Sequence, residues 1–346
     1  MRESPSTPAQ TFTLATMFLL MVPGCSSESD DEPDPDPVPV VIQDIDYVKR
    51  KYYRLADPES LAGGAVALPV HVFELFLDDK NALNDIAEGA RETFAFMNAT
   101  TGSQTDTTGV YRGFFHRLDV NEDYQIILAT GEITLESPLS VDQALAMFYI
   151  EADGDTVGDL TQVNENSAEV YELQILAPPQ RELYDDAKGF APARAFEMKN
   201  VYFLQAQNII PESLELVIRR RGTVAGEQEL DIQNDPTNPA NIAEYVRILG
   251  LDYRGVNTPE PDLRVEPEFI DFEEGTLTFP NITPFAPDSS TVNVIVPPYQ
   301  VTTGRTSEPG PKLLQYNSIL YTQEPIDFPG QDLYQIEARY TMPTPP

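Results

Sequence analysis

The chain has 346 residues, of which 41% are hydrophobic, so it is long enough for about two domains with packed cores. Its 56 acidic and 22 basic residues give a net charge of −34, which repels phosphates and disfavours nucleic acid and anionic lipid headgroups as partners. The 31 prolines and 19 glycines are spread along the chain and argue against an α-dominated fold, because proline interrupts helices.

The N-terminus has the pattern of an exported lipoprotein. Arg2 precedes an apolar run over residues 12–22, which is too short to cross a bilayer as a helix but suits a secretory signal. The run leads into Val-Pro-Gly-Cys, which resembles a bacterial lipobox, and Cys25 is the only cysteine in the chain. We therefore predict a lipoprotein signal peptide over residues 1–24 and lipidation of Cys25, with an ordinary cleaved signal or an uncleaved anchor as the alternatives.

Residues 25–43 form an acidic, proline-rich linker. Aspartate, glutamate and valine alternate with proline in its second half. Such a composition does not bury a core and favours the extended polyproline II conformation. We expect a disordered N-terminal tether that holds the folded part of the chain away from a membrane.

A first β-rich module is predicted over residues 44–178. Short apolar or alternating runs bounded by Gly and Pro are typical of strands. These runs cover residues 47–55, 70–77, 110–118, 124–129, 132–136, 145–151 and 170–176. Residues 82–97 fit both a helical stripe and the end of a strand, and we interpret them as a loop leading into a strand.

A second β-rich module is predicted over residues 179–346. It opens with residues 196–221, where two strand patterns flank Pro211 and are expected to form a hairpin, because proline presets the dihedral of a turn. Further strands are predicted at residues 242–251, 268–272, 276–280, 292–296, 313–322 and 333–341. The expected fold is mainly β, with two antiparallel, sandwich-like modules of the Ig-like type after the disordered tether.

Two acidic loops have incomplete calcium-binding patterns. Asp119, Asn121 and Asp123 have the opening spacing of a calcium loop, but Tyr124 stands where the sharp turn needs glycine. The second loop, residues 153–159, is incomplete in the same way. We interpret both as turns, the acidic residues as a solvated surface, and we expect no metal site.

The sequence predicts no catalytic residue and no cofactor. Nucleophilic catalysis needs an activated Ser, Cys or Thr beside a base, and both histidines, His71 and His116, fall in strand patterns. The chain lacks a G-x-S-x-G elbow, an H-E-x-x-H motif and a glycine-rich phosphate loop. The basic cluster at residues 219–221 is interpreted as internal ion pairs rather than as a docking site for an acidic partner. We expect a non-enzymatic protein, with an acidic hydrolase as an alternative.

Several short strings of residues occur in the order found in one known family. The first string contains Met198, Lys199, Asn200 and Tyr202. The second contains Leu251, Asp252, Pro261, Asp262, Gly275, Phe279, Pro280 and Phe285. Together with an upstream string near residues 114–149, they resemble the SprA-like family of cell-surface gliding-motility proteins, which form the outer-membrane translocon of type IX secretion.

The resemblance extends over about residues 45–290 and marks these positions as structural rather than catalytic. It implies a lipid-anchored protein of the cell outer membrane, periplasmic or surface-exposed, that takes part in type IX secretion or gliding motility. Its expected partners are outer-membrane or secretion-system proteins and the membrane through the lipid anchor, and not nucleic acid.

Members of this family are far longer and include a large membrane barrel. The chain is therefore expected to correspond to an N-terminal-type region, as a stand-alone homologue, a split piece or an accessory module. The alternative is a surface-exposed lipoprotein that binds a ligand or matrix and has no part in secretion.

Overall fold

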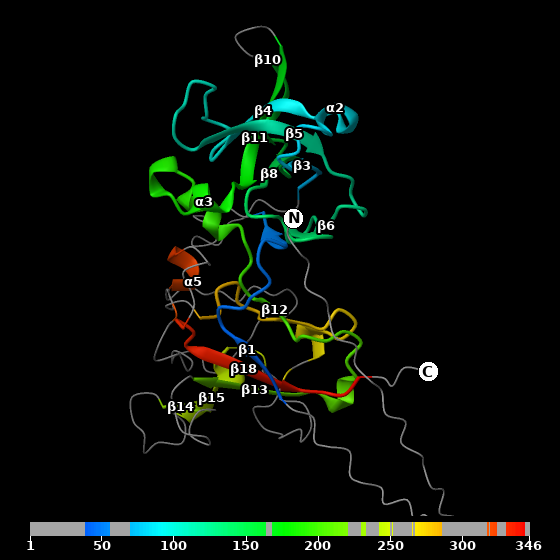
Figure 1. Cartoon of the computed structure of the whole chain (residues 1–346), viewed down its shortest axis with the longest axis vertical. Coiled ribbons are helices and arrows are strands. Elements are labelled where there is room, and N and C mark those ends of the chain that lie inside the picture. Colours follow the sequence, from blue (N-terminus) through cyan, green and yellow to red (C-terminus); the bar gives the residue numbers. More distant parts are fainter. Residues whose placement is uncertain are drawn as a thin grey trace, which may run out of the picture. The chain divides into compact units, whose positions relative to one another are not determined.

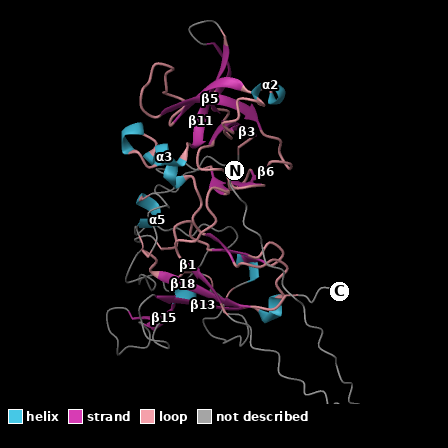
Figure 2. Ribbon diagram, viewed as in Figure 1, coloured by secondary structure: helices cyan, strands magenta, loops and turns pink. Residues whose placement is uncertain are grey.

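The computed structural model describes eleven stretches of the chain, and its ordered elements are mostly strands (Figure 2). The described residues are 39–55, 70–163, 168–220, 230–232, 242–249, 251, 265, 267–285, 317, 319–323 and 330–342. Most strand pairs are antiparallel, which confirms the prediction of a mainly β fold with antiparallel sheets. None of the helices in these stretches is long and apolar enough to cross a membrane.

The largest sheet closes on itself as a five-stranded barrel (Figure 1). Its strands, in order of pairing, are β11 (Glu169–Ala177), β4 (Arg91–Phe96), β5 (Val110–Arg117), β3 (Val72–Asp78) and β8 (Ala144–Ile150). The barrel closes because β8 also pairs with β11. Two short strands extend it: β10 (Asp159–Val163) beside β11, and β9 (Thr156–Val157) beside β8.

One pair in this barrel, β4 with β11, is parallel, although only antiparallel pairing was expected. The interior is filled by side chains that alternate along each strand, including Leu75, Phe115 and Ile175, all fully buried. Alanines at 144 and 146 on β8 are also fully buried, and their small size lets the opposite walls approach closely. The barrel is therefore a filled core and not a channel.

A three-stranded sheet shares the hydrophobic core of the barrel. Its order is β2 (Tyr52–Arg54), β7 (Glu132–Leu135) and β6 (Tyr124–Ile127). Tyr53 and Ile133 face each other across β2 and β7 and are buried in the same cluster as the barrel strands. The short helices α3 (Gln180–Leu183), η1 (Asp186–Lys188) and η2 (Ala191–Ala195) follow β11.

The remaining strands surround a second hydrophobic core. One sheet has the order β1 (Val40–Gln43), β18 (Tyr334–Arg339) and β13 (Glu215–Arg220), and Figure 1 shows these three strands side by side. A second sheet has the order β12 (Val201–Phe203), β17 (Thr276–Thr278) and β16 (Ile270–Asp271), and β14 (Leu230–Ile232) pairs with β15 (Ile242–Glu244). The short helices here are η3 (Pro211–Ser213), α4 (Tyr245–Ile248), η5 (Pro267–Phe269) and α5 (Ile319–Thr322).

Strand β18 holds its sheet together through residues that alternate into the core. Ile336 pairs with Ile42 of β1 on one side and with Ile218 of β13 on the other, and all three are buried. This row joins strands that lie far apart in the sequence. Residues 40–43, which the composition assigns to the linker, are thus part of a strand.

The predicted hairpin over residues 196–221 is wrong. Its first strand, β12, pairs with β17, and its second strand, β13, pairs with β18. Gln205 and Asn208 adopt positive φ, and the backbone N–H groups of Leu204, Asn208 and Ile209 donate to carbonyls of residues 272–275. The connection is therefore bonded to another turn, which directs the two strands into different sheets.

Other strand predictions are corrected in part. Residues 242–251 form the short strand β15 followed by helix α4, and the described part of residues 313–322 contains helix α5. A short apolar run has no period that separates a strand from one helical turn. Residues 82–97 contain helix α2 (Asp85–Glu88) before β4, and the predicted strand at 292–296 lies outside the described residues.

Gly275, in the turn between β16 and β17, offers a sharp test of this architecture. Its φ is +67°, and an added Cβ would lie 1.6 Å from the carbonyl oxygen of Ala206. Gly89, with φ of +69° and nothing within 4 Å, is the matched control. We expect Gly89→Ala to lower the free energy of unfolding by about 1–2 kcal/mol, the cost of a left-handed alanine. Gly275→Ala should cost clearly more in urea unfolding, and equal losses would contradict the packing described.

Candidate functional site

Residues 197–202, here called the junction segment, join parts of the chain that are distant in sequence. The N–H of Met198 donates to the carbonyl of Tyr52 (2.9 Å). Asn200 donates through Nδ2 to the carbonyl of Phe279 (2.6 Å), and its own carbonyl accepts from the N–H of Phe279 (2.8 Å). The Tyr202 hydroxyl donates to the carbonyl of Asp44 (2.7 Å). Met198, Asn200 and Tyr202 of the predicted family string therefore bind segments that precede and follow them in the sequence.

A buried ion pair lies in the junction segment. Lys199 is only 2% exposed, and its Nζ is 3.4 Å from Oε2 of Glu197, which is 7% exposed. The same Nζ donates to the carbonyl of Arg194 (3.1 Å) and lies 5.9 Å from the ring centroid of Tyr47. Glu197 accepts the backbone N–H of Arg50 through Oε1 (2.7 Å). Each charge thus has partners, which buried charges require.

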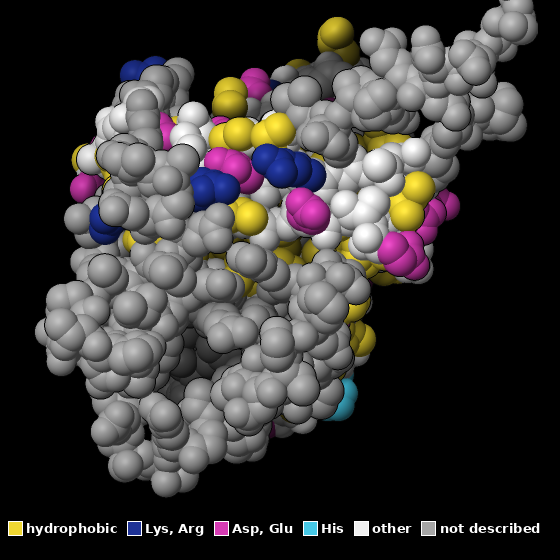
Figure 3. All heavy atoms as spheres, turned by 90° about the horizontal axis from the view of Figure 1, so that it is seen from below, with side chains coloured by type: hydrophobic (Ala, Val, Ile, Leu, Met, Phe, Trp, Pro, Cys, Tyr) yellow, Lys and Arg dark blue, Asp and Glu magenta, His cyan; other side chains and the backbone are white. Residues whose placement is uncertain are grey.

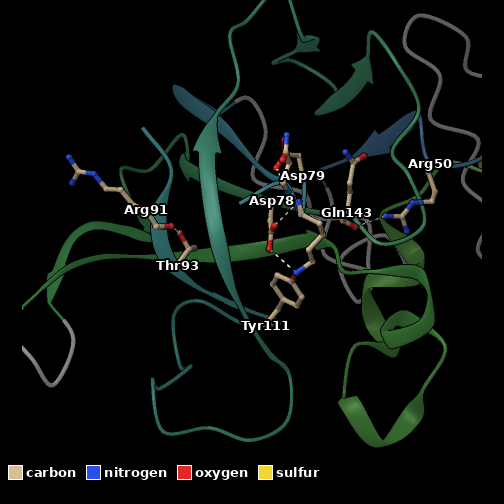
Figure 4. Close-up of polar contacts among 9 residues, drawn as sticks. Arg50, Asp78, Asp79, Arg91, Thr93, Tyr111 and Gln143 are labelled. Carbon is tan, nitrogen blue, oxygen red and sulfur yellow. Dashed lines mark hydrogen bonds and ion pairs between the residues drawn. The ribbon is translucent and has the colours of Figure 1, made fainter. Parts of the chain in front are cut away.

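Arg50 connects the junction segment to the barrel. Its backbone has φ of +57°, which an arginine adopts only where its surroundings hold it, and its side chain is buried. One terminal nitrogen donates to the carbonyl of Gln143 (2.9 Å), just before β8 (Figure 4). The other donates to the carbonyl of Pro178 (3.3 Å), just after β11. Its own carbonyl accepts the N–H of Leu139 (2.9 Å). Arg50 therefore forms hydrogen bonds with the chain at the end of the barrel where β8 begins and β11 ends.

The tyrosines beside this ion pair are held as neutral phenols. Burial raises the pKa of Tyr47 well above its usual value, and the negative charge of Glu197 raises it further. Burial likewise raises the pKa of Tyr53, although the positive charge of Arg50 opposes this. Both tyrosines are therefore uncharged at neutral pH.

A second polar group lies under β18. The Asp44 carboxylate is fully buried and accepts the N–H of Leu333 (3.2 Å to Oδ1) and Nδ2 of Asn317 (2.9 Å to Oδ2). The backbone N–H of Asp44 donates to the carbonyl of Tyr334 (3.0 Å). Burial raises the pKa of Asp44 to about 6, partly offset by these hydrogen bonds and reinforced by the nearby charge of Asp332. Asp44 thus binds the start of β18 through both its carboxylate and its backbone N–H.

The other family-matching positions form an aromatic core around Tyr202. The ring of Phe279 lies 5.4 Å from that of Tyr202, and the ring of Phe285 lies 6.3 Å from it, both edge to face. Leu251 and Gly275 are also buried, and Pro280 is half-buried. The positions that lie outside the described residues are Cys25, Asp252, Pro261 and Asp262.

Sequence reasoning missed a polar group at the end of β3. The buried carboxylate of Asp78 accepts the Tyr111 hydroxyl (2.8 Å) and Nζ of Lys80 (3.0 Å), and Lys80 also donates to Tyr111 (Figure 4). Burial and the hydrogen bond to Asp78 raise the pKa of Tyr111. An added Cβ on Gly113 would lie 2.0 Å from Oδ2 of Asp78, so the carboxylate needs glycine there. A glycine inside the alternating pattern of β5 is the signal that would have indicated this close approach.

The two acidic loops are turns, as predicted. The N–H of Asp119 donates to Oδ2 of Asp123 (2.8 Å), and Asn121 adopts φ of +69°. In the second loop the N–H of Asp155 donates to Oδ1 of Asp153 (3.1 Å). Among the residues that the structure describes, no group of three or more His, Cys, Asp or Glu side chains is placed to hold a metal ion.

Arg219 of the basic cluster and the two histidines have partners within the chain. Nε of Arg219 lies 3.0 Å from Oε1 of Glu337, which confirms an internal ion pair for this member of the basic cluster. On the face seen in Figure 3, basic and acidic side chains also lie next to one another. His116 lies 3.0 Å from the carboxylate of Glu88, and His71 bonds the carbonyl of Ala152 (3.2 Å) at an exposed position.

Exposed apolar side chains occur on strands at the edges of the sheets. Strand β6 is the outer strand of its sheet and carries Ile127, followed by Leu128, both exposed. Val163 on β10 and Val41 on β1 are exposed in the same way. An edge strand offers backbone groups that a partner strand can pair with. These edges are the candidate binding surface.

Comparison of the sequence with protein families and with curated proteins gives no match in either case. The geometry itself separates two kinds of feature. The junction segment, Arg50 and Asp44 are buried and bonded to the chain, so their role is structural. The outer strands carry the features that a partner protein could contact.

The ion pair of the junction segment can be tested by removing one partner. Lys199→Met leaves Glu197 buried without its positive partner, which costs about 3–5 kcal/mol in comparable pairs. Urea unfolding should show a loss of this size, and the double variant with Glu197→Gln should recover part of it. Glu169→Gln, at the exposed pair with Arg91, is the control and should cost at most about 1 kcal/mol. A loss for Lys199→Met as small as the control would contradict a stabilising junction.

Asp44 should make stability depend on pH in an unusual direction. Its pKa is about 6 in the folded chain and near 3.8 when unfolded, so folding favours the protonated form. The stability gained from a neutral Asp44 is complete below pH 3.8 and is lost as the pH rises to about 6. The free energy of unfolding of the native chain, relative to Asp44→Asn, should fall by about 3 kcal/mol over this window. Parallel curves for the two chains would contradict this prediction.

Proposed function

We propose that the chain is a non-enzymatic, lipid-anchored protein of the cell envelope that acts by binding other proteins. In this proposal it resembles SprA and is a component or accessory of type IX secretion or gliding motility. Its partners are outer-membrane or secretion-system proteins, and the lipid on Cys25 attaches it to the outer membrane. The mainly β architecture suits such a scaffold, and the proposal does not require the Ig-like sandwich arrangement that the sequence suggested.

One observation carries the proposal. The residues that resemble the family are separated by about eighty positions, yet Asn200 and Phe279 exchange two hydrogen bonds, and Tyr202 contacts Phe279 and Phe285. Gly275 lies against Ala206 in the same region. A string of residues that is shared because of a common fold is expected to meet in one core in this way. This convergence supports a shared structural unit, and it supports the proposed role only through the resemblance.

The polar groups give independent support for a structural rather than a catalytic role. The carboxylates of Glu197, Asp44 and Asp78 are buried and accept hydrogen bonds from the chain itself. A catalytic carboxylate has to reach substrate, whereas these three hold segments in place. Binding would then fall to exposed edges such as β6 and β10.

The alternative is a surface lipoprotein that binds a ligand or matrix outside any secretion system. The exposed apolar residues on β6 and β10 would serve that function equally well. The two proposals differ in what happens to exported proteins when the chain is missing, and that difference can be measured.

Deletion of the gene in its bacterial host provides the test. We expect loss of type IX cargo from the culture medium and loss of gliding, both restored by the native gene. Complementation with Cys25→Ser should fail to restore them and should leave the protein outside the membrane fraction, while mass spectrometry of the native N-terminus should find a lipidated Cys25. Normal secretion and gliding after deletion would exclude the proposed function and favour the ligand-binding alternative. An unmodified Cys25 would exclude the lipid anchor alone.

A further inference from the structure

The turn between β3 and β4 presents two large apolar side chains to solvent. Leu83 is 96% exposed and Ile86, on the single-turn helix α2, is 97% exposed. Leu83 lies in the turn that precedes this helix, and the neighbouring Ala82 and Ala87 are exposed as well. This group of residues, 82–87, is here called the α2 knob. Figure 1 shows α2 beside β4 and β5 at the outside of the barrel.

The knob is held in a fixed conformation. Nδ2 of Asn84 donates to Oδ2 of Asp79 and to Oε1 of Glu88, both at 2.8 Å. Helix α2 ends at Gly89 with φ of +69°, and Glu88 also lies 3.0 Å from His116 on β5. A surface that is already ordered loses little conformational entropy when a partner binds. Leu83 and Ile86 are therefore exposed on an ordered segment of the chain.

Strand β5, which α2 contacts, carries another exposed apolar residue. Phe114 is 52% exposed and lies two positions before His116, so both side chains point to the same face of the strand. His116 contacts Glu88, the last residue of α2. Phe114 is therefore an exposed apolar side chain on the face of β5 that contacts α2.

The surroundings of the knob are acidic. Residues 79–92 contain Asp79, Asp85, Glu88 and Glu92. The two basic residues in this range are both engaged in ion pairs, Lys80 with Asp78 and Arg91 with Glu169. The net field around Leu83 and Ile86 is therefore negative, and it complements a positively charged partner.

We propose that the α2 knob is a docking site for a basic protein segment that carries apolar side chains, with Leu83 and Ile86 as the anchors. Lysine or arginine residues of the segment would face Asp79 and Asp85, and its apolar side chains would cover the knob. A second copy of this chain is disfavoured because each copy carries a net charge of −34, and an anionic membrane is disfavoured for the same reason. This inference rests on the proposed role as a protein-binding protein, but it does not require that the partner belong to a secretion system.

A binding experiment with a defined probe tests the docking site. The probe is a fluorescent amphipathic peptide of leucine and lysine, and its counterpart has glutamate in place of lysine. Charge alone attracts a basic peptide to an acidic protein, so the dependence on Leu83 and Ile86 decides the outcome. We expect saturable binding of the basic peptide to the purified full chain, weakened at least about tenfold in Leu83→Ser/Ile86→Ser. The acidic peptide should not bind.

The controls separate the knob from other exposed apolar residues. Val120→Ser/Val141→Ser removes two residues that are also more than half exposed, outside the knob and outside the edge strands, and should bind the peptide as the native chain does. Both double variants should unfold at the native urea concentration, because the replaced side chains are on the surface. Asp85→Asn should weaken binding less than the loss of the anchors and should reduce its salt dependence.

Several results would overturn the proposal. Equal affinity of the native chain and Leu83→Ser/Ile86→Ser would do so, as would equal weakening by Val120→Ser/Val141→Ser. Knob-dependent sedimentation with phosphatidylcholine vesicles, or knob-dependent self-association, in the absence of peptide binding would assign the surface to a membrane or to a second copy. If deletion of the gene abolishes secretion but the purified native chain does not bind the peptide, the docking site fails while the proposed function stands. If the peptide binds through the knob but secretion is normal after deletion, the docking site stands while the proposed function fails.

Discussion

The buried pair of Glu197 and Lys199 is the constraint on which the arrangement of the chain depends. Two opposite charges removed from water are stable only if their remaining hydrogen-bonding groups are also satisfied, and this requirement positions their neighbours. The carbonyl of Arg194 and the N–H of Arg50 meet it. Because Arg50 in turn reaches the carbonyls of Gln143 and Pro178, the same cluster fixes the end of the barrel.

Each of the two hydrophobic cores contains a buried carboxylate that accepts hydrogen bonds. The barrel core has Asp78, which binds Tyr111 and lies against Gly113 on a neighbouring strand. The other core has Asp44, whose carboxylate orders the start of β18. Both are single buried carboxylates that accept hydrogen bonds from segments distant in sequence. Such groups contribute specificity of pairing, because a shifted register would leave a buried charge without donors.

Part of this structure follows from the sequence. Strands with clear alternation or long apolar runs, such as β3, β5, β8 and β11, lie where the pattern predicts them, because burial of one face selects the period. The partner of each strand was harder to predict. The stretch 196–221 has two good strand patterns and a proline between them, yet its connection is bonded to residues 272–275. That choice is made by long-range hydrogen bonds, which a local pattern does not contain.

The polar residues show the same limit. The string at residues 198–202 stands out by resemblance, but no local pattern indicates that Lys199 is buried against Glu197, two residues before it. Two residues apart on an extended chain normally face the same side, so the spacing fits the pair once the backbone is known. Asp78 and Lys80 have this spacing as well. Acidic residues are so frequent in this chain that position alone does not distinguish a buried carboxylate from a solvated one.

The central place of β18 has a consequence for how the protein is made. Strand β1 near the start of the chain and strand β13 near its middle both pair with residues 334–339 and not with each other. Neither can complete its sheet until the ribosome has synthesised β18, and closing so long a loop is slow. The sheet of β1, β18 and β13 therefore stays incomplete until synthesis of the chain has reached residue 339.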